Sequence, residues 1–415
     1  MAVEGETLSS GLLAGVRVLD LSLLGPAALA GHLVDFGAEV IKIEAPSGDY
    51  VRQMTWPIID GTSLLHLHVN RGKESLVLDL KTPEADAVLS GLIAKSDVII
   101  EAMRPGFLDK RGFTHERLRA INPAIVFCSI SGYGATGPYR DLPAHGVAFD
   151  SWAGQINPVV DADGFCRTPD QTNIGITAGP AFGAMAVLAA LVRARTTGEG
   201  AYMEIAQSDA AAYFDWYRIE SWKAYEQPAD VVTGNSSDNF ARRKPGLGGM
   251  WDGVRYQFYE SSDGHVLLMA SEQSFWKNFC VGVGREDLFE QYPGSQYADH
   301  ALGNTALHSE LREIFRTRTS AEWLQFASDR NTTIAPVNTP ETVITDPQFV
   351  NRFTWTTMDQ TGCEQLLFPL HIAGEQLLVP GVAPTIGQHT DEVLRRVLGY
   401  DAERLAALRA GGTLG

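Results

Sequence analysis

Residues 15–46 read GVRVLDLSLLGPAALAGHLVDFGAEVIKIEAP, and this stretch decides the fold class. Its first part, 15–21, is a short apolar run with β-branched side chains, which is typical of a buried strand. Gly25 and Pro26 then open a helix, because proline suits the first helical turn. Gly37 suits the end of that helix, and a second apolar strand follows at 39–44. A strand, a helix and a strand over about 30 residues predict a parallel βαβ unit.

The same alternation continues through the N-terminal half of the chain. Helical patterns at 82–94 and 114–120 alternate with apolar strands at 97–101 and 123–129. Repeated strand–helix units predict an α/β domain with a mostly parallel sheet. The first strand–helix turn lacks the GxGxxG pattern of dinucleotide-binding proteins, so we expect no nicotinamide cofactor.

The second half changes in character after a long polar segment. Residues 228–250 have a loop-like composition, and a loop of this length is usually a linker or a lid. A hairpin at 256–270 and helices at 273–283, 306–317 and 321–329 then predict a smaller α+β domain, with another hairpin at 366–372 and 375–379. We expect a large domain at 10–210, a linker and lid-like loop at 211–250, the small domain at 251–330, and a return linker with the C-terminal part of the large domain at 331–415.

Charge and cysteine content exclude several classes of function. The 415-residue chain has a formal net charge of −17, which argues against nucleic acid or an anionic membrane as the main partner. Its four cysteines are scattered, which predicts reduced thiols in a cytoplasmic protein and no zinc site. The N-terminus is polar and acidic, unlike a signal peptide. No run of 18 apolar residues occurs, so we expect no membrane span.

The stretch 129–154, SISGYGATGPYRDLPAHGVAFDSWAG, is the candidate active site. An apolar strand runs into a loop with three glycines, and glycine lets a backbone approach a ligand closely. His145 and Asp150 follow on a segment that is expected to be helical. α/β enzymes place their sites at the carboxyl ends of parallel strands, which is where this loop lies.

Basic residues next to glycines form a second group of candidates. Arg71 and Lys73 flank Gly72 just before a strand, and Arg104 lies in the loop that follows strand 97–101. Arginine and lysine at such places suit an anionic ligand such as a phosphate. For Arg71 and Lys73, a solvated turn and a phosphate clamp both remain open.

Nine segments in order, between about residues 15 and 400, resemble the class III CoA-transferases. This family is also named for carnitine and bile-acid CoA-transferases, and it includes formyl-CoA transferase and the α-methylacyl-CoA racemases. The segments are GVRVLDLS, GPAALAGHLVDFGAEVIKIEAPSGD, NRGKESLVLDLKTPEA, DVIIEAMRPGFLDKRGF, FCSISGYGATGPYRDLPAH, RTTGEGAYMEIAQSDA, DGHVLLMASEQSFW, APVNTPETVITDPQFVNR and GQHTDEVLRRVLGY.

The resemblance implies a Rossmann-like large domain, an inserted small domain and an interlocked dimer. It implies an acyl-CoA substrate, a carboxylic-acid acceptor and no metal. A lid over the intermediates is implied at GLGG, with Gly246, Gly248 and Gly249. The residues that the resemblance assigns to CoA binding are Lys42, Asn70, Arg71, Lys73, Arg104, Gly132, Tyr133 and Gly134.

The chain departs from the family pattern at the position of the nucleophile. In the transferases a catalytic Asp attacks the thioester, and the resemblance puts that position at Gly146. The racemases have a catalytic His that matches His145 and a supporting carboxylate that matches Glu272. Their second acid is missing from the matching stretch NIGITAGP.

Three functions follow from this departure. The first is CoA transfer between carboxylic acids, with His145, Asp150 and Glu272 as candidate catalytic residues; Asp150 shares a helix face with Gly146. A capping or pairing role within the fold remains open for Asp150, and a structural, hydrogen-bonded role remains open for His145. The second is an α-methylacyl-CoA racemase or isomerase in which His145 acts as acid and base. The third is a catalytically silent CoA-binding subunit. We expect CoA transfer, by a homodimer or by a heterodimer with a family paralogue.

Overall fold

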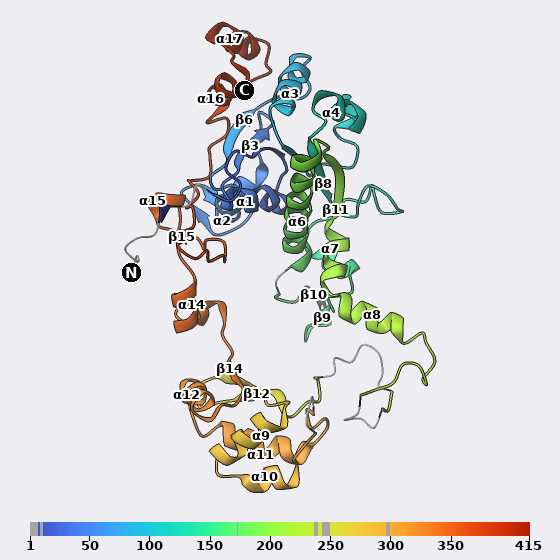
Figure 1. Ribbon diagram of the computed structural model, residues 1–415, viewed down its shortest axis with the longest axis vertical. Helices are drawn as coiled ribbons and strands as arrows, with labels where there is room; N and C mark the ends of the chain where they lie inside the picture. Colours follow the sequence, from blue (N-terminus) through green and yellow to red (C-terminus); the bar gives the residue numbers. More distant parts are fainter. Residues whose placement is uncertain (1–6, 9–10, 172, 236–239, 243–249, 296–298) are drawn as a thin grey trace. The chain divides into compact units, whose positions relative to one another are not determined.

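The computed structural model describes residues 7–8, 11–171, 173–235, 240–242, 250–295 and 299–415. The chain divides into two compact units, which are described separately (Figure 1). Unit 1 comprises Met1–Trp216 and Phe353–Gly415, and unit 2 comprises Tyr217–Arg352. The finer boundaries expected from the sequence stay a prediction.

Unit 1 is built around a six-stranded parallel sheet. Its strands lie in the order β11-β8-β7-β2-β3-β6, and every neighbouring pair is parallel. The α/β class and the parallel sheet are therefore confirmed. The strands are β2 (Arg17–Leu21), β3 (Glu39–Glu44), β6 (Glu74–Val77), β7 (Val98–Glu101), β8 (Val126–Ser131) and β11 (Ala201–Ala206).

Helices cover both faces of this sheet. Alternate residues of a strand point to opposite faces, so each strand contributes side chains to two cores. Val18 and Ile100 join one core with α1 (Ala28–Asp35) and α6 (Ile174–Thr197). Leu19 and Ile99 join the other core with α3 (Glu84–Ala94), α4 (His115–Ile121), α16 (Thr390–Leu398) and α17 (Ala402–Ala410). Figure 1 shows α6 crossing the sheet at the level of β8 and β11. A sheet covered on both faces explains why its strands are almost continuously apolar.

The C-terminal segment completes unit 1. The backbone N–H of His389 donates to the carbonyl oxygen of Ser75 at 2.9 Å, which fixes the start of α16 beside β6. β15 (Glu375–Gln376) pairs with β1 (Thr7–Leu8). The hairpin predicted at 366–372 and 375–379 is wrong, because the two segments share one bridge among the described residues, Ile372 with Glu375. Leu366 instead bridges to Trp355.

Unit 2 combines a three-stranded antiparallel sheet with helices. Its sheet contains β12 (Tyr256–Glu260), β13 (His265–Met269) and β14 (Ile334–Pro336). The helices that pack on it are α9 (Gln273–Gly282), α10 (Glu286–Gln291), α11 (Thr305–Phe315) and α12 (Ser320–Arg330). Stacked aromatic rings, among them Phe279 and Phe315, fill the core between these elements.

Helix α6 is long and apolar enough to cross a membrane by length and composition alone, but half of it is buried inside the protein. Its small residues allow close packing. A Cβ at Gly175 would lie 2.7 Å from Phe149, and a Cβ at Gly183 would lie 2.4 Å from Leu29. We therefore interpret α6 as a core helix of unit 1.

Candidate active site

A cavity of about 460 Å³ opens in unit 1 at the carboxyl ends of β2, β7 and β8. Residues 23–26 after β2, 102–105 after β7 and 130–133 at the end of β8 form three of its walls. Residues 140–146, between β8 and α5 (Val147–Trp152), form a fourth. This is the edge of a parallel sheet at which α/β proteins bind their ligands.

The glycine loop predicted from the sequence begins in the wall formed by residues 130–133. Gly132 and Tyr133 line the cavity, and a Cβ at Gly132 would lie 3.1 Å from the Phe149 ring. Gly134 has a φ of 84°, which favours glycine, and its N–H donates to Ser131 Oγ at 3.0 Å. Because that N–H is already engaged, it is not free to bind a ligand oxygen in this conformation.

His145 and Gly146 lie side by side in the cavity wall. His145 is exposed, and no hydrogen bond of its ring was found among the described residues. Gly146 has φ 42° and ψ −109°, which strains any residue with a Cβ. A Cβ built there would meet only Asn173 Nδ2, at 4.0 Å. The expected position of the nucleophile is thus open, and its backbone is suited to glycine.

Asp150 lies behind the cavity wall and acts as a helix cap. Its side chain is fully buried, and Oδ1 accepts the backbone N–H of Ile174 at 2.7 Å and of Gly175 at 3.0 Å. These N–H groups belong to the first turn of α6, which has no internal acceptors for them. Asp150 is not among the residues that line the cavity. Its sharing a helix face with Gly146 therefore does not bring its carboxylate into the cavity.

Glu272 belongs to unit 2, where it is exposed and directly precedes α9. Its support of His145 stays a prediction, since the two residues lie in different units. The expected lid residues Gly246, Gly248 and Gly249 lie outside the described residues.

The basic residues near the amino end of β6 are buried in ion pairs. Arg71 binds both oxygens of Asp35 at 2.9 Å through Nη2. The Lys73 ammonium donates to Asp20 Oδ2 at 2.7 Å and to Asn70 Oδ1 at 3.0 Å. Lys42 pairs with Asp49 at 3.1 Å, and its side chain is fully buried.

These contacts correct the expectation of a phosphate clamp at Arg71 and Lys73. Both side chains are at most 4% exposed, and neither lines the cavity. Each charge is already compensated by a buried carboxylate. Breaking a buried pair leaves an uncompensated charge and is strongly unfavourable. In this conformation Lys42, Asn70, Arg71 and Lys73 stabilise the fold.

The buried charges shift the ionisation of their neighbours. Burial and the nearby Arg52 guanidinium lower the pKa of His66 to about 3. Burial opposes ionisation of Asp20, but the cations of Lys73 and Lys42 outweigh it and keep the pKa of Asp20 below its usual value. His66 is therefore neutral at physiological pH, with Nε2 2.8 Å from Arg52 Nη1.

Arg104 differs from these residues. It is exposed and lines the cavity, and no partner of its guanidinium was found in the described part of the chain. Of the CoA-binding residues expected from the sequence, Arg104, Gly132 and Tyr133 share the cavity with His145. A free guanidinium at a cavity suits a phosphate or a carboxylate.

The cavity lining contains residues that the sequence analysis missed, and three of them have long or charged polar side chains. Arg140 and Asp141 lie in the stretch already quoted, with Arg140 Nε 3.7 Å from Asp141 Oδ1. Asp141 is the one carboxylate in the cavity lining among the described residues. Gln207 enters from the other side, directly after β11. The run Arg140-Asp141 in a glycine-rich loop was a usable signal, whereas nothing in the sequence near Gln207 pointed to the site.

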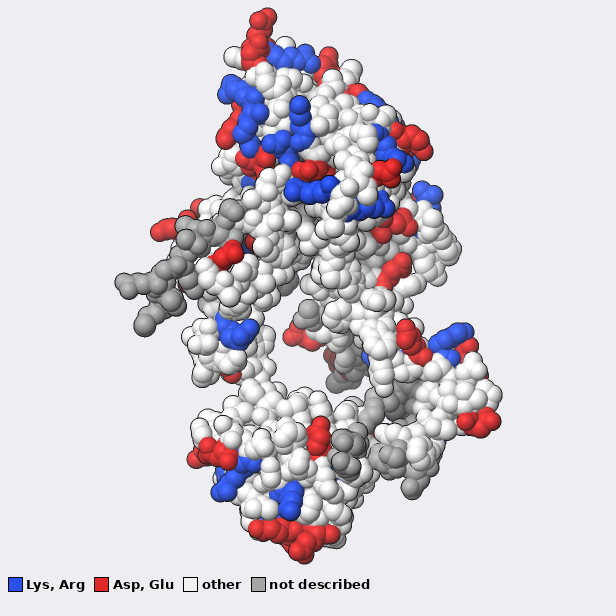
Figure 2. Space-filling model, viewed as in Figure 1, with Lys and Arg blue, Asp and Glu red and all other residues white. Residues whose placement is uncertain are grey.

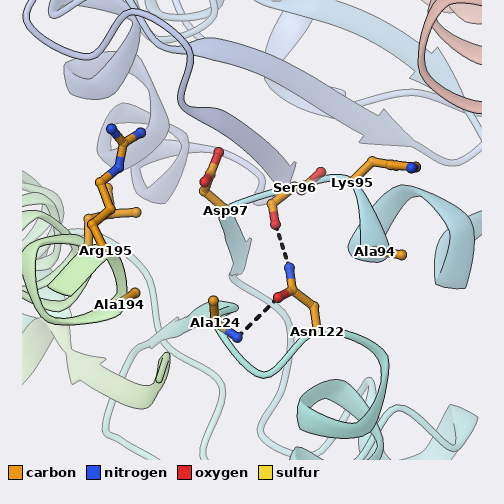
Figure 3. A pocket seen from close by; sticks show the side chains of 9 residues that line it. Ala94, Lys95, Ser96, Asp97, Asn122, Ala124, Ala194 and Arg195 are labelled. Carbon is orange, nitrogen blue, oxygen red and sulfur yellow. Dashed lines mark hydrogen bonds between the residues drawn. The ribbon is translucent and has the colours of Figure 1, made fainter. Parts of the chain in front are cut away.

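A second cavity, of about 300 Å³, lies at the opposite edge of the sheet (Figure 3). Asn122 lies in its lining, where its Nδ2 donates to the Ser96 carbonyl at 2.8 Å and its Oδ1 accepts the Ala124 N–H at 3.0 Å. These bonds join the turns that precede β7 and β8. The polar groups are therefore used within the fold, and none of the predicted site residues lies there.

Charges of both signs share the face of unit 1 that Figure 2 presents. Figure 2 shows acidic and basic side chains mixed over the part of unit 1 that carries α3, α4, α16 and α17. Arg396, for example, lies 2.7 Å from Glu39, and Arg117 lies 2.6 Å from Asp86. Among the described residues no group of three His, Cys, Asp or Glu side chains could hold a metal ion.

Comparison with known proteins shows the family of the chain. Residues 13–390 match the model of CoA-transferase family III. The chain is 30% identical to the succinyl-CoA–L-malate CoA-transferase beta subunit of Chloroflexus aurantiacus, over 96% of this chain and 97% of the relative. It is 27% identical to a probable fatty acyl-CoA transferase of Mycobacterium tuberculosis, over 92% of this chain and 97% of the relative.

Solved structures show the same fold. A CaiB/BaiF family protein from Brucella suis has a TM-score of 0.75 and 24% identity, covering 93% of this chain and 99% of that protein. The chain belongs to CoA-transferase family III.

Proposed function

We propose that this protein transfers CoA from an acyl-CoA to a carboxylic acid, with the thioester bound in the cavity of unit 1. The observation that carries the proposal is the meeting of the glycine loop, His145 and the free guanidinium of Arg104 around one cavity. The loop allows close approach of a ligand, and Arg104 supplies the charge that an anionic ligand needs. The relatives' names, which include CoA-transferases for succinyl-CoA and L-malate, agree with this chemistry.

The reaction can be balanced without an enzyme carboxylate at position 146. The acceptor carboxylate attacks the thioester carbonyl, which forms an anhydride and releases the CoA thiolate. The thiolate then attacks the acceptor's carbonyl in the anhydride, forming the new thioester and releasing the donor carboxylate. In this proposal Arg104 holds an anionic group of a substrate, and the exposed His145 lies beside the reacting centre.

A partner chain is the second part of the proposal. Tyr213 and Phe214, at the end of α7 (Gln207–Phe214), are 69% and 60% exposed. Exposed aromatic surface of this kind is typical of a protein interface. The Chloroflexus relative is named a beta subunit, which favours a heterodimer with a paralogue as an alternative to a homodimer. The interlocked arrangement stays a prediction.

The test uses the purified chain with a panel of acyl-CoA donors and free acids. Mass spectrometry of the thioesters is expected to detect a new acyl-CoA that matches the added acid. Arg104→Ala should lower the rate, whereas Lys110→Ala, an exposed cation nearby that does not line the cavity, should not. Exchange of the α-proton with D2O in the absence of an acceptor acid would favour the isomerase. Activity that needs a co-expressed paralogue would favour the silent subunit.

A further inference from the structure

Gln207 enters the cavity from beneath α6. It is the first residue of α7, it follows β11 directly, and it is 5% exposed. The N–H of the next residue, Ser208, donates to the carbonyl oxygen of Gly132 at 3.0 Å. This bond ties the start of α7 to the glycine loop, and both Gln207 and Gly132 line the cavity.

Two glycines of α6 make room for this side chain. A Cβ at Gly179 would lie 2.9 Å from Gln207 Cγ, and a Cβ at Gly175 would lie 3.2 Å from the Gln207 carbonyl oxygen. Contacts under 3 Å force a neighbour to shift, so a larger residue at 179 would displace Gln207. The packing of α6 therefore holds the glutamine in one place.

The carboxamide of Gln207 has no hydrogen-bond partner among the residues that the structure describes. Its Oε1 is buried without a donor, and no bond of its Nε2 was found among the described residues. Buried polar groups are nearly always paired, since an unpaired group is destabilising. Nε2 is not among the buried unpaired atoms, so it is the accessible atom of this amide and the one available to a ligand in the cavity.

We propose that Gln207 is a substrate-binding residue that hydrogen-bonds the acyl-thioester end of the bound acyl-CoA. This inference rests on the proposed function. A carboxamide has both donors and an acceptor, so it can pair with the thioester or carboxylate oxygens of the reacting acids. It is also neutral, so it adds no charge that would repel or trap a carboxylate.

Gln155 offers a matched control. Like Gln207 it has a buried Oε1 without a partner, and it also contacts α7, where its Nε2 donates to the carbonyl oxygen of Ala211 at 2.6 Å. It does not line the cavity. Gln155→Leu removes a real hydrogen bond of the fold, whereas Gln207→Leu removes a group that the fold leaves unpaired.

The experiment measures the Kd of acetyl-CoA and of free CoA by titration calorimetry, and Tm, for the full-length wild type and both variants. Gln207→Leu should raise the Kd for acetyl-CoA about three- to tenfold. It should change the Kd for CoA less, and its Tm should not fall. Gln155→Leu should lower Tm and leave both Kd values unchanged. Gln207→Asn, which retracts the amide by one methylene, should weaken acetyl-CoA binding in the same way if the leucine variant does not fold.

Three results would overturn the inference. An unchanged Kd for acetyl-CoA in the Gln207 variants would show that the amide does not contact the ligand. An equal loss for CoA and acetyl-CoA would show that it does not contact the acyl end. If the wild type bound neither compound, the proposed function itself would fail. Equal binding of acetyl-CoA by the wild type and the Gln207 variants would instead refute only the role of Gln207.

Discussion

Replacing Asp150 separates a structural from a chemical role for the buried carboxylate of α5. In the structure, Oδ1 caps α6 by accepting the Ile174 and Gly175 N–H groups at 2.7 and 3.0 Å. A hydrogen bond to a charged group contributes about 1.5–3 kcal/mol, and loss of a helix cap costs about 0.5–2 kcal/mol. The two bonds share one oxygen and do not add fully. We expect Asp150→Ala to lower the free energy of unfolding by about 3 kcal/mol.

The assay combines urea unfolding, followed by far-UV circular dichroism, with amide hydrogen exchange of residues 174–178. Exchange in this first turn of α6 should accelerate in Asp150→Ala. Asp150→Asn keeps an acceptor oxygen and should lose only about 1 kcal/mol. Asp163→Ala removes the same charge from an exposed position and serves as the control. A variant Asp150→Ala that is as stable as the wild type, exchanges at the wild-type rate and yet has lost CoA transfer would refute the capping role.

Three further predictions concern pH and binding. Burial and the nearby Asp109 charge raise the pKa of Glu101 to about 7. The folded state therefore loses stability relative to the unfolded state as pH rises from about 4.5 to 7. Glu101→Gln should be more stable than the wild type by about 2–3 kcal/mol above pH 7 in urea titrations. His66 has a pKa of about 3 in the fold and stays neutral there, while the same residue in the unfolded chain takes up a proton below about pH 6.5. The free energy of unfolding of the wild type should therefore fall with decreasing pH by up to about 1.4 kcal/mol per pH unit more than that of His66→Gln. Parallel slopes for the two proteins would contradict this. Arg104→Ala should raise the Kd for acetyl-CoA about tenfold to a hundredfold by calorimetry, and a Kd equal to that of Lys110→Ala would show that Arg104 does not bind the ligand.

The sequence predicted the sheet because its strands are local patterns. The unit at residues 15–46 became β2 and β3, and the strand before the glycine loop became β8. The place of the cavity followed from the same reasoning, since parallel strands put their carboxyl ends at one edge. His145 and Arg104 lie at that edge as a consequence of the topology.

The partners of the charged residues could not be predicted in this way. Arg71 pairs with Asp35 of α1, and Lys73 pairs with Asp20 of β2, so each acceptor comes from an element far back in the chain. A basic residue beside a glycine looks the same in a sequence whether it faces solvent or a buried carboxylate. Only the packing of α1 and β2 against β3 and β6 decides between them.

The choice between a capping and a chemical role for Asp150 could not be made from the sequence for a similar reason. Glycine and β-branched residues weaken the helix propensity of the stretch NIGITAGP, so its pattern does not mark where a helix begins. In the structure α6 begins at Ile174, where the carboxylate of Asp150 supplies the missing acceptor from α5. A cap from a distant residue leaves no local signal.

A crystal structure of the protein soaked with acetyl-CoA tests whether the cavity of unit 1 holds the thioester. We predict electron density for the ligand between the loop of Arg104 and the glycine loop, with the thioester carbonyl near His145 and Gln207. Density for acetyl-CoA at another surface, with this cavity empty, would contradict it.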